Sequence, residues 1–272
     1  MPLRRTLVAA LTAACLFPPL AGAAETAKLT VTGASTLAPL VSEIAHRFEN
    51  ANPGVRIDVQ TGGSSRGVAD VRRGIADIGM VSRVLKPDED DLTVNIVARD
   101  GVGMIVNTAN PVDPLSRDQV IGIYTGRITN WSQIGGPDRP ITVVNKAEGR
   151  STLDIFLEHV QLKPTDVKAH IVIGDNEQGV KVVAGNPWAI GYVSIGTAEY
   201  HAQAGTPVRL MALGPVVATT GNVANGTYGA ARPLNLVTAK PPEGVAARFI
   251  AYSQSPAVHD LIHDQYFVPA PR

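Results

Sequence analysis

Strand-like and helix-like stretches alternate along the chain from residue 28 onward. Lys28–Thr32 alternates apolar and polar residues as a strand does, and Leu37–Asn50 repeats its apolar residues every four positions, which is typical of a helix. Asn52-Pro53-Gly54 indicates a turn, and Val55–Val59 predicts a second strand. This order predicts an α/β fold whose neighbouring strands are joined by right-handed crossovers.

The next stretch, from Gln60 to Arg83, continues this order around a polar loop. Gly62–Ser65 is small and hydroxyl-rich, and it leads into a helical pattern with apolar residues at 68, 71 and 75, then into a strand at 76–81. A helix start exposes unpaired N–H groups at the positive end of the helix dipole. The loop therefore predicts an anion site; the alternative is that Ser64 and Ser65 only cap the helix.

Two other loops stand at the same kind of junction. Gly33–Thr36 follows the first strand, and Lys146–Thr152 joins a strand at 141–145 to a helix at 153–160. Ligands of open α/β sheets lie at the carboxyl ends of the strands. We therefore expect the loops to face one crevice, although Thr36 and either Ser151 or Thr152 are also suitable N-cap residues.

The remaining pattern predicts further strands and helices, and residues 210–229 stay unassigned. The expected strands are Leu92–Ala98, Gly101–Asn107, Ile190–Val193 and Leu234–Thr238, and the expected helices are Asp118–Tyr124, Val180–Asn186, Val245–Ser253 and Pro256–Gln265.

The N-terminus has the pattern of a signal peptide over residues 1–23. Arg4 and Arg5 precede an apolar run at 7–16 that is too short to span a bilayer, and small residues at 21–23 fit a cleavage site. We therefore predict a periplasmic mature chain that begins near Ala24. The alternative is a lipid anchor at Cys15, although Thr12 fits a lipoprotein box poorly. Without Cys15 the mature chain has no cysteine, so it has no disulfide.

Composition narrows the classes of function. The chain has 272 residues, 44% apolar and 18% charged, which is ordinary for a soluble protein and long enough for two lobes. Its net charge of zero gives no bulk attraction to nucleic acid or to an anionic membrane. Neither G-x-S-x-G nor H-E-x-x-H occurs, and the pair His259 and His263 lacks a third ligand. The sequence therefore predicts no enzyme, no cofactor and no metal.

Several motifs, in matching order and spacing, resemble those of a known family. The chain is similar over nearly its whole mature length to the Pst-type phosphate-binding proteins of bacterial ABC importers. The motifs are GAST at 33–36, GGSSRG at 62–67, ADIGMVSR at 76–83, NPV at 110–112, YTGRITNWSQIGG at 124–136, EGRST at 148–152, IGYVS at 190–194 and RPLNLV at 232–237.

The resemblance implies a two-lobed type II periplasmic-binding-protein fold with a ligand cleft between the lobes. Each lobe would be a mixed sheet flanked by helices, with lobe 1 formed by 26–106 and 234–272 and lobe 2 by 107–233. The chain would cross between lobes near 106–110 and 230–234. It also implies a monomer that hands inorganic phosphate to ABC permease subunits.

The resemblance also implies the phosphate ligands. They are the hydroxyl residues Ser35, Thr36, Ser64, Ser65, Ser151 and Thr152, with Arg83 and Arg150 as candidate cations.

The sequence departs from the family pattern at two places. Ser82 or Arg83 stands where family members place a proton-accepting aspartate, and Lys146 stands near a usual arginine. The alternatives are therefore another tetrahedral oxyanion, such as sulfate or molybdate, or a phosphate sensor without transport. Arg83 has a second alternative, an ion pair with Asp77 or Asp88.

Overall fold

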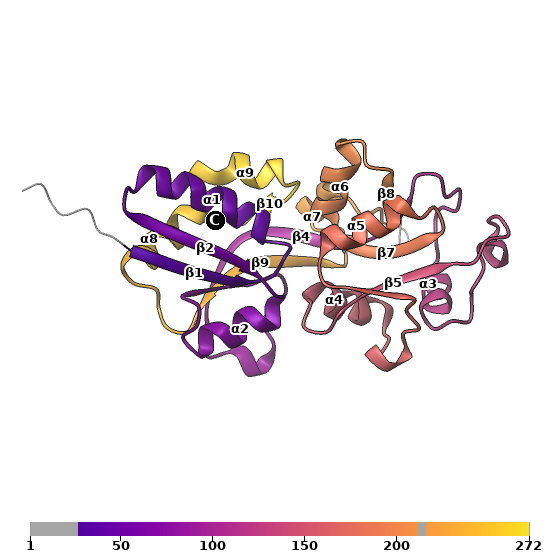
Figure 1. The fold of residues 1–272 in the computed structure, drawn as a ribbon, viewed down its shortest axis with the longest axis horizontal. Helices are drawn as coiled ribbons and strands as arrows, with labels where there is room; N and C mark the ends of the chain where they lie inside the picture. The colour runs from indigo at the N-terminus through magenta and orange to yellow at the C-terminus, as the bar shows by residue number, and fades with distance from the viewer. Residues whose placement is uncertain (1–26, 212–215, 272) are drawn as a thin grey trace, which may run out of the picture.

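The chain forms two halves that lie side by side and are connected by two strands (Figure 1). This computed structural model describes residues 27–211 and 216–271. The predicted signal peptide at 1–23, with Cys15, lies outside the described residues. Within the described part, no helix is long and apolar enough to cross a membrane.

The strands form one mixed sheet that continues through both halves. Its order is β2-β1-β3-β9-β4-β7-β5-β6, with β8 and β10 also paired to β4. The strands are β1 (Ala27–Gly33), β2 (Val55–Thr61), β3 (Ile78–Val81), β4 (Thr93–Asn107), β5 (Thr142–Lys146), β6 (Ile171–Ile173), β7 (Ala189–Ser194), β8 (Val208–Met211), β9 (Ala231–Thr238) and β10 (Val268–Pro269).

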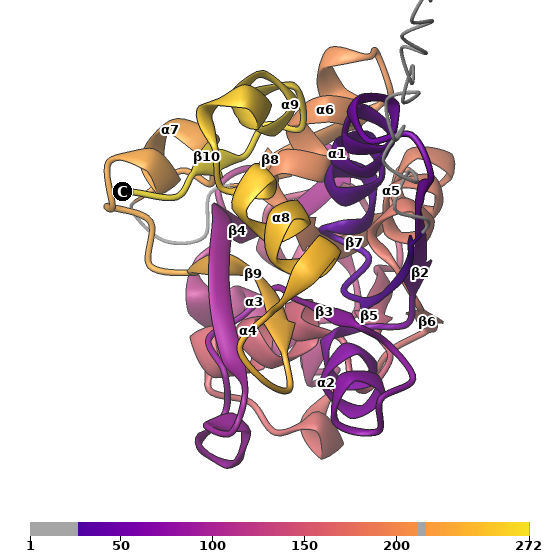
Figure 2. The same cartoon turned by 90° about the vertical axis from the view of Figure 1, so that its left-hand side faces the viewer.

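The helices of the described residues cover the faces of this sheet. In the first half α1, α8 and α9 lie on one side of the strands and α2 lies on the other (Figure 2). The helices are α1 (Ala38–Ala51), α2 (Ser64–Arg72), α3 (Arg117–Tyr124), α4 (Ser151–Val160), α5 (Asn176–Gly185), α6 (Ile195–Gln203), α7 (Thr220–Ala224), α8 (Gly244–Ser253) and α9 (His259–Asp264).

Parallel pairing brings the ends of the first strands to one edge. β1 pairs in parallel with both β2 and β3, and Gly33 at its end lies opposite Thr61 and Met80. The loops that follow β1 and β2 therefore leave the sheet side by side, together with Ser82 after β3. The α/β fold predicted from the strand–helix order is confirmed.

β4 passes from one half to the other as a single strand, where the sequence predicted two. β9 pairs with it from Thr93 to Gly101, and β7 pairs with it from Val102 to Val106. The backbone stays extended through the polar residues at 99 and 100 because β9 supplies a continuous partner there. The change of partner falls between Gly101 and Val102, a few residues before the crossing that the resemblance implied.

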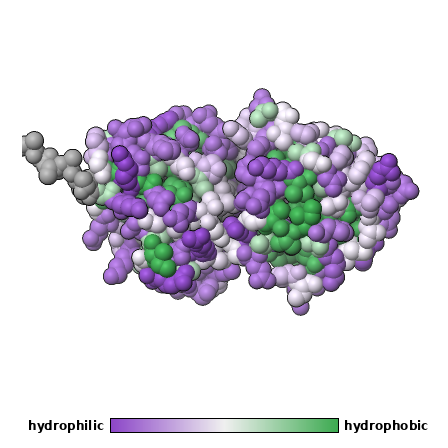
Figure 3. All heavy atoms as spheres, in the orientation of Figure 1, coloured by the Kyte–Doolittle hydropathy of each residue, from purple (hydrophilic) through white to green (hydrophobic). Residues whose placement is uncertain are grey.

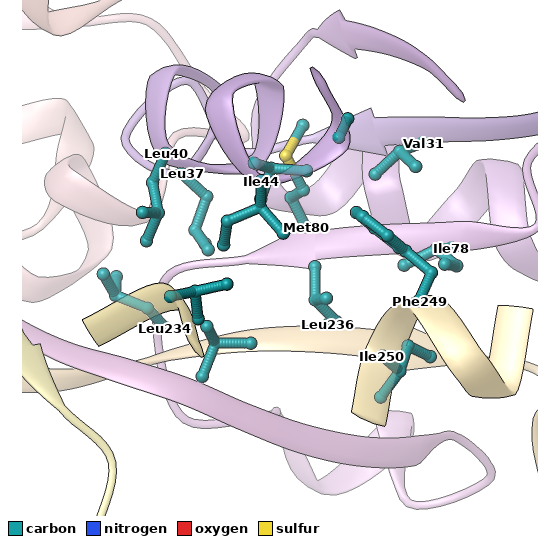
Figure 4. Close-up of a cluster of buried hydrophobic side chains, with 14 of the residues drawn as sticks. Val31, Leu37, Leu40, Ile44, Ile78, Met80, Leu234, Leu236, Phe249 and Ile250 are labelled. Carbon is teal, nitrogen blue, oxygen red and sulfur yellow. The ribbon is translucent and has the colours of Figure 1, made fainter. Parts of the chain in front are cut away.

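Each half has its own apolar core. In the first half, Leu40 and Ile44 of α1 pack over Met80 of β3, with Phe249 of α8 in the same cluster (Figure 4). The second half is built around Trp131, whose side chain is fully buried. Apolar surface residues gather on one face of that second half (Figure 3). The largest cluster of each half thus lies within that half, as in a chain of two lobes.

Two helices differ locally from the expectation, and one helix was not expected. The helix expected to reach residue 75 ends at Arg72, so Ile75 is 56% exposed. The helix expected at 256–265 is a 3₁₀ turn, Pro256–Val258, followed by α9. The sequence pattern also gave no signal for α6, whose start is capped by Ser194.

Candidate functional site

The polar loops predicted from the sequence surround one small cavity between the two halves. About 10 Å³ of it is open to the centre of a water-sized sphere, which is near the roughly 10–15 Å³ that one water needs by this measure and far below the roughly 300–1,000 Å³ of pockets that hold drug-sized molecules. The cavity therefore suits a small ion. Its lining residues are Ala34, Ser35, Thr36, Gly63, Ser64, Ser82, Arg150, Ser151 and Thr152.

Three helices that begin at or next to this cavity have no side-chain cap. Leu37, Gly63 and Arg150 precede α1, α2 and α4, and none of them has a side chain that accepts a hydrogen bond from the first turn. By contrast, Ser116 and Asp175 cap α3 and α5. The predicted alternative of serine caps on α2 is therefore not what the structure shows. The backbone N–H groups at these helix starts are suited to bind an anion.

Ser64 connects the two halves at the cavity. Its side chain is fully buried, and its Oγ accepts a hydrogen bond from the backbone N–H of Ser82 at 3.1 Å. The hydroxyl of Ser151, from the other half, also donates to this Oγ. Close by, the N–H of Ser65 donates to the carbonyl of Gly149 at 3.4 Å. The two lobes thus touch around the cavity, which is a closed arrangement.

The two candidate cations are in different positions. Arg150 lines the cavity and, within the described residues, makes no ion pair. The guanidinium of Arg83 instead forms a buried ion pair with both carboxylate oxygens of Glu89, at 2.6 and 2.7 Å. Arg83 lines a separate, larger pocket, into which Asp154 and Glu158 also face. That pocket is of mixed charge, because Lys86 and Arg232 also line it, and it contains none of the predicted hydroxyl residues. The structure thus gathers the predicted residues except Ser65 and Arg83.

Sequence reasoning missed an ion pair behind the cavity. Arg232 and Asp100 are almost completely buried, and the guanidinium Nη2 lies 2.8 Å from the carboxylate. The same guanidinium donates to Thr36 Oγ1 at 3.2 Å and to the backbone carbonyl of Ser82 at 3.2 Å. Arg232 opens the motif at 232–237, to which the sequence analysis gave no role at the site. Nothing in the sequence indicated that Asp100 is its partner.

Lys146 is a second buried cation near the cavity. Its Nζ donates to the carbonyl of Asp175 at 2.6 Å and to Asn176 Oδ1 at 3.0 Å. Burial lowers the pKa of Lys146 to about 7; Asp175 opposes this shift, and the positive charges of Arg232 and Arg150 add to it. A bound anion would favour the charged form of Lys146, because opposite charges stabilise each other.

The lowered pKa of Lys146 predicts a pH dependence of stability. Between about pH 7 and its unfolded pKa near 10.4, the unfolded chain binds more protons than the folded one, so stability rises with pH. We expect Lys146→Met to remove this rise, on the order of a few kcal/mol. Urea unfolding of wild type and variant at several pH values measures it, and parallel pH profiles would contradict it.

The fold and the cavity define a class of protein: a two-lobed solute-binding protein that encloses a small anion between its lobes. The family model of the PBP superfamily domain matches residues 19–257. The phosphate-binding protein PstS of Bacillus subtilis is 29% identical over 247 residues, which cover 89% of this chain and 80% of the relative.

Solved structures agree with this assignment. A substrate-binding protein assigned to phosphate ABC transport in Clostridium perfringens, with bound phosphate, has a TM-score of 0.82 and 30% identity, covering 90% of this chain and 100% of that one. An ABC-type phosphate transport receptor from Vibrio cholerae has a TM-score of 0.72 and 30% identity over 89% of this chain and 100% of that one. The chain belongs to the PstS-like phosphate-binding proteins of the PBP superfamily.

Proposed function

We propose that this protein captures inorganic phosphate in the cavity between its lobes for delivery to an ABC importer. The observation that carries the proposal is the convergence of uncapped helix starts, buried hydroxyls and Arg150 on one ion-sized cavity. The phosphate-binding names of the relatives support the choice of ion.

Hydrogen bonds supply the affinity in this proposal. Each hydrogen bond to a charged group contributes roughly 1.5–3 kcal/mol net. Several such bonds from the hydroxyl of Ser64 and from the N–H groups of the helix starts offset the loss of water around the ion. The binding free energy that remains after this cost is enough for micromolar affinity, which corresponds to about −8 kcal/mol. Because the donors come from both lobes, the bound ion favours the closed arrangement.

The proposed setting is the periplasm, where the chain acts as a monomer after removal of its signal peptide and meets the permease subunits of the importer. The proposed role is binding without catalysis. In support, those of the described residues (27–211 and 216–271) that line the cavity include several hydroxyls but no histidine or carboxylate that would act as a general base.

Two substitutions test the site. We expect Ser64→Ala and Arg150→Ala each to weaken phosphate binding at least about tenfold, because each removes a partner of the ion, a change of about 1.4 kcal/mol. Titration calorimetry measures the affinity. Arg127→Ala is the control, since Arg127 is exposed and, among the described residues, its side chain donates only to Thr125 Oγ1, at 3.3 Å. Wild-type affinity in both site variants would disprove the assignment of these residues.

A further inference from the structure

Arg83 does not line the cavity and instead faces a carboxylate of the other half. Its side chain is 5% exposed, and its Nε lies 3.6 Å from Oδ2 of Asp154 in α4. Both atoms are buried, and among residues 27–211 and 216–271 neither has a hydrogen-bond partner. A cation and a carboxylate at this distance attract each other strongly where water is excluded. This attraction therefore acts across the gap between the two halves.

Arg83 is held in one orientation by residues near it in the first half. Its Nη1 and Nη2 donate to the two carboxylate oxygens of Glu89 at 2.6 and 2.7 Å, and Nη1 also donates to the carbonyl of Val84 at 3.1 Å. The Nδ2 of Asn235 donates to the backbone carbonyl of Arg83 at 2.8 Å. A guanidinium is a rigid, planar fork of donors, so these contacts leave its Nε edge directed at Asp154. The cation is thus in place before the halves meet.

Asp154 belongs to the helix whose start reaches the cavity from the second half. α4 begins at Ser151, which lines the cavity together with its neighbours Arg150 and Thr152. Asp154 follows Ser151 by three residues, so the two lie on neighbouring parts of one helix face. Its side chain is 36% exposed and borders the larger pocket that Arg83 also lines. An attraction between Asp154 and Arg83 therefore draws the start of α4 toward the first half.

We propose that Asp154 is a positioning residue that holds the lobes closed over the bound ion through its attraction to Arg83. The pair forms when the halves meet, because each residue is fixed in a different half. A contact that exists only in the closed arrangement raises the population of that arrangement and so lowers the dissociation constant of the ion. This inference rests on the proposed function, because it concerns the retention of the same ion.

A simple repulsion between Asp154 and the ion would have the opposite effect on affinity. A carboxylate near an anion site repels the anion, so removal of its charge would tighten binding if Asp154 did not hold the lobes together. The ion pair across the lobes predicts weaker binding instead. The direction of the change in affinity therefore separates the two explanations.

The Asp154→Asn variant, which keeps the shape of the side chain and removes its charge, tests this role. We expect its dissociation constant for phosphate to rise about fivefold to tenfold. The dissociation rate should account for the change, because the ion leaves when the lobes open, while the association rate changes less than about twofold. Titration calorimetry measures the affinity, and rapid filtration of labelled phosphate measures the rates. Unchanged or tighter binding would overturn the inference, as would a loss that lies in association alone.

Glu158→Gln is the matched control. Glu158 lies one helical turn after Asp154, lines the same larger pocket and loses the same charge in the variant. It is exposed, and no ion pair among the described residues includes it. We expect this variant to keep the wild-type affinity within about twofold. A loss equal to that of Asp154→Asn would show a general effect of charge on α4 and would overturn the positioning role.

Urea unfolding in phosphate-free buffer separates positioning from folding. We expect Asp154→Asn to unfold at the wild-type midpoint, because both residues of the pair keep their other contacts within their own halves. A midpoint that falls together with the affinity would show a loss of structure and would overturn the positioning role. If the wild type binds phosphate and both variants match it, only this inference fails. If the wild type binds no phosphate, the proposed function fails and this inference fails with it.

Discussion

The Gly63→Ala variant is expected to bind phosphate at least about 100-fold more weakly than the wild type. A Cβ on Gly63 would lie 2.5 Å from the carbonyl oxygen of Gly149 and 2.9 Å from Cδ of Arg150, both in the opposite lobe. Real Cβ atoms do not approach backbone so closely, so the lobes would have to separate and the donors around the ion would no longer converge. Titration calorimetry measures the loss.

Gly74→Ala is the control for backbone strain. Gly63 and Gly74 both have positive φ, 95° and 67°, so an alanine at either position is strained. A Cβ on Gly74, however, has nothing within 4 Å. We expect Gly74→Ala to keep its affinity for phosphate. If both variants lost the same affinity for phosphate, backbone strain would explain the effect, and the explanation by contact between the lobes would be wrong.

Arg232→Met is expected to lower the free energy of unfolding by about 3–5 kcal/mol, because it leaves the carboxylate of Asp100 buried without its counter-charge. Both side chains of this pair are 1% exposed. Urea unfolding measures the change. Combining the variant with Asp100→Asn should recover part of the loss, since the uncompensated charge is then removed.

The exposed pair of Arg47 and Asp260 offers a matched comparison. Its side chains are 38% and 59% exposed although the atoms are 2.7 Å apart, and solvent screens such pairs. We expect Arg47→Met to leave the unfolding midpoint nearly unchanged. If Arg232→Met behaved in the same way, the buried pair would have no special role in stability.

The order of elements could be predicted from the sequence because it depends on local periodicity. The apolar residues of α1, for example, recur every four positions and pack into one core. The loops at 33–36 and 62–65 were predictable as neighbours because they follow parallel strands, which end at a common edge, whereas the loop at 146–152 lies in the other half and meets them across the cavity. The glycines and hydroxyl residues of these loops indicated that the site binds an anion.

The contacts behind these loops could not be predicted because they join distant positions. Asp100 and Arg232 are 132 residues apart, and Thr36 and Asn176 are 140 apart. No local pattern indicates which carboxylate an arginine meets. The same reason explains Arg83, for which Asp77 and Asp88 were the expected partners and Glu89 is the observed one. The unbroken β4 also depends on its distant partner β9.

The position of Asp100 and Arg232 has a consequence for how fast an ion is captured. Both residues lie where β4 and β9 pass from one half to the other. Any rotation that parts the halves has its axis near these strands, and points close to an axis travel least. The buried pair therefore keeps its place when the halves part, and Thr36, to which Arg232 donates, is already held in position when an ion arrives.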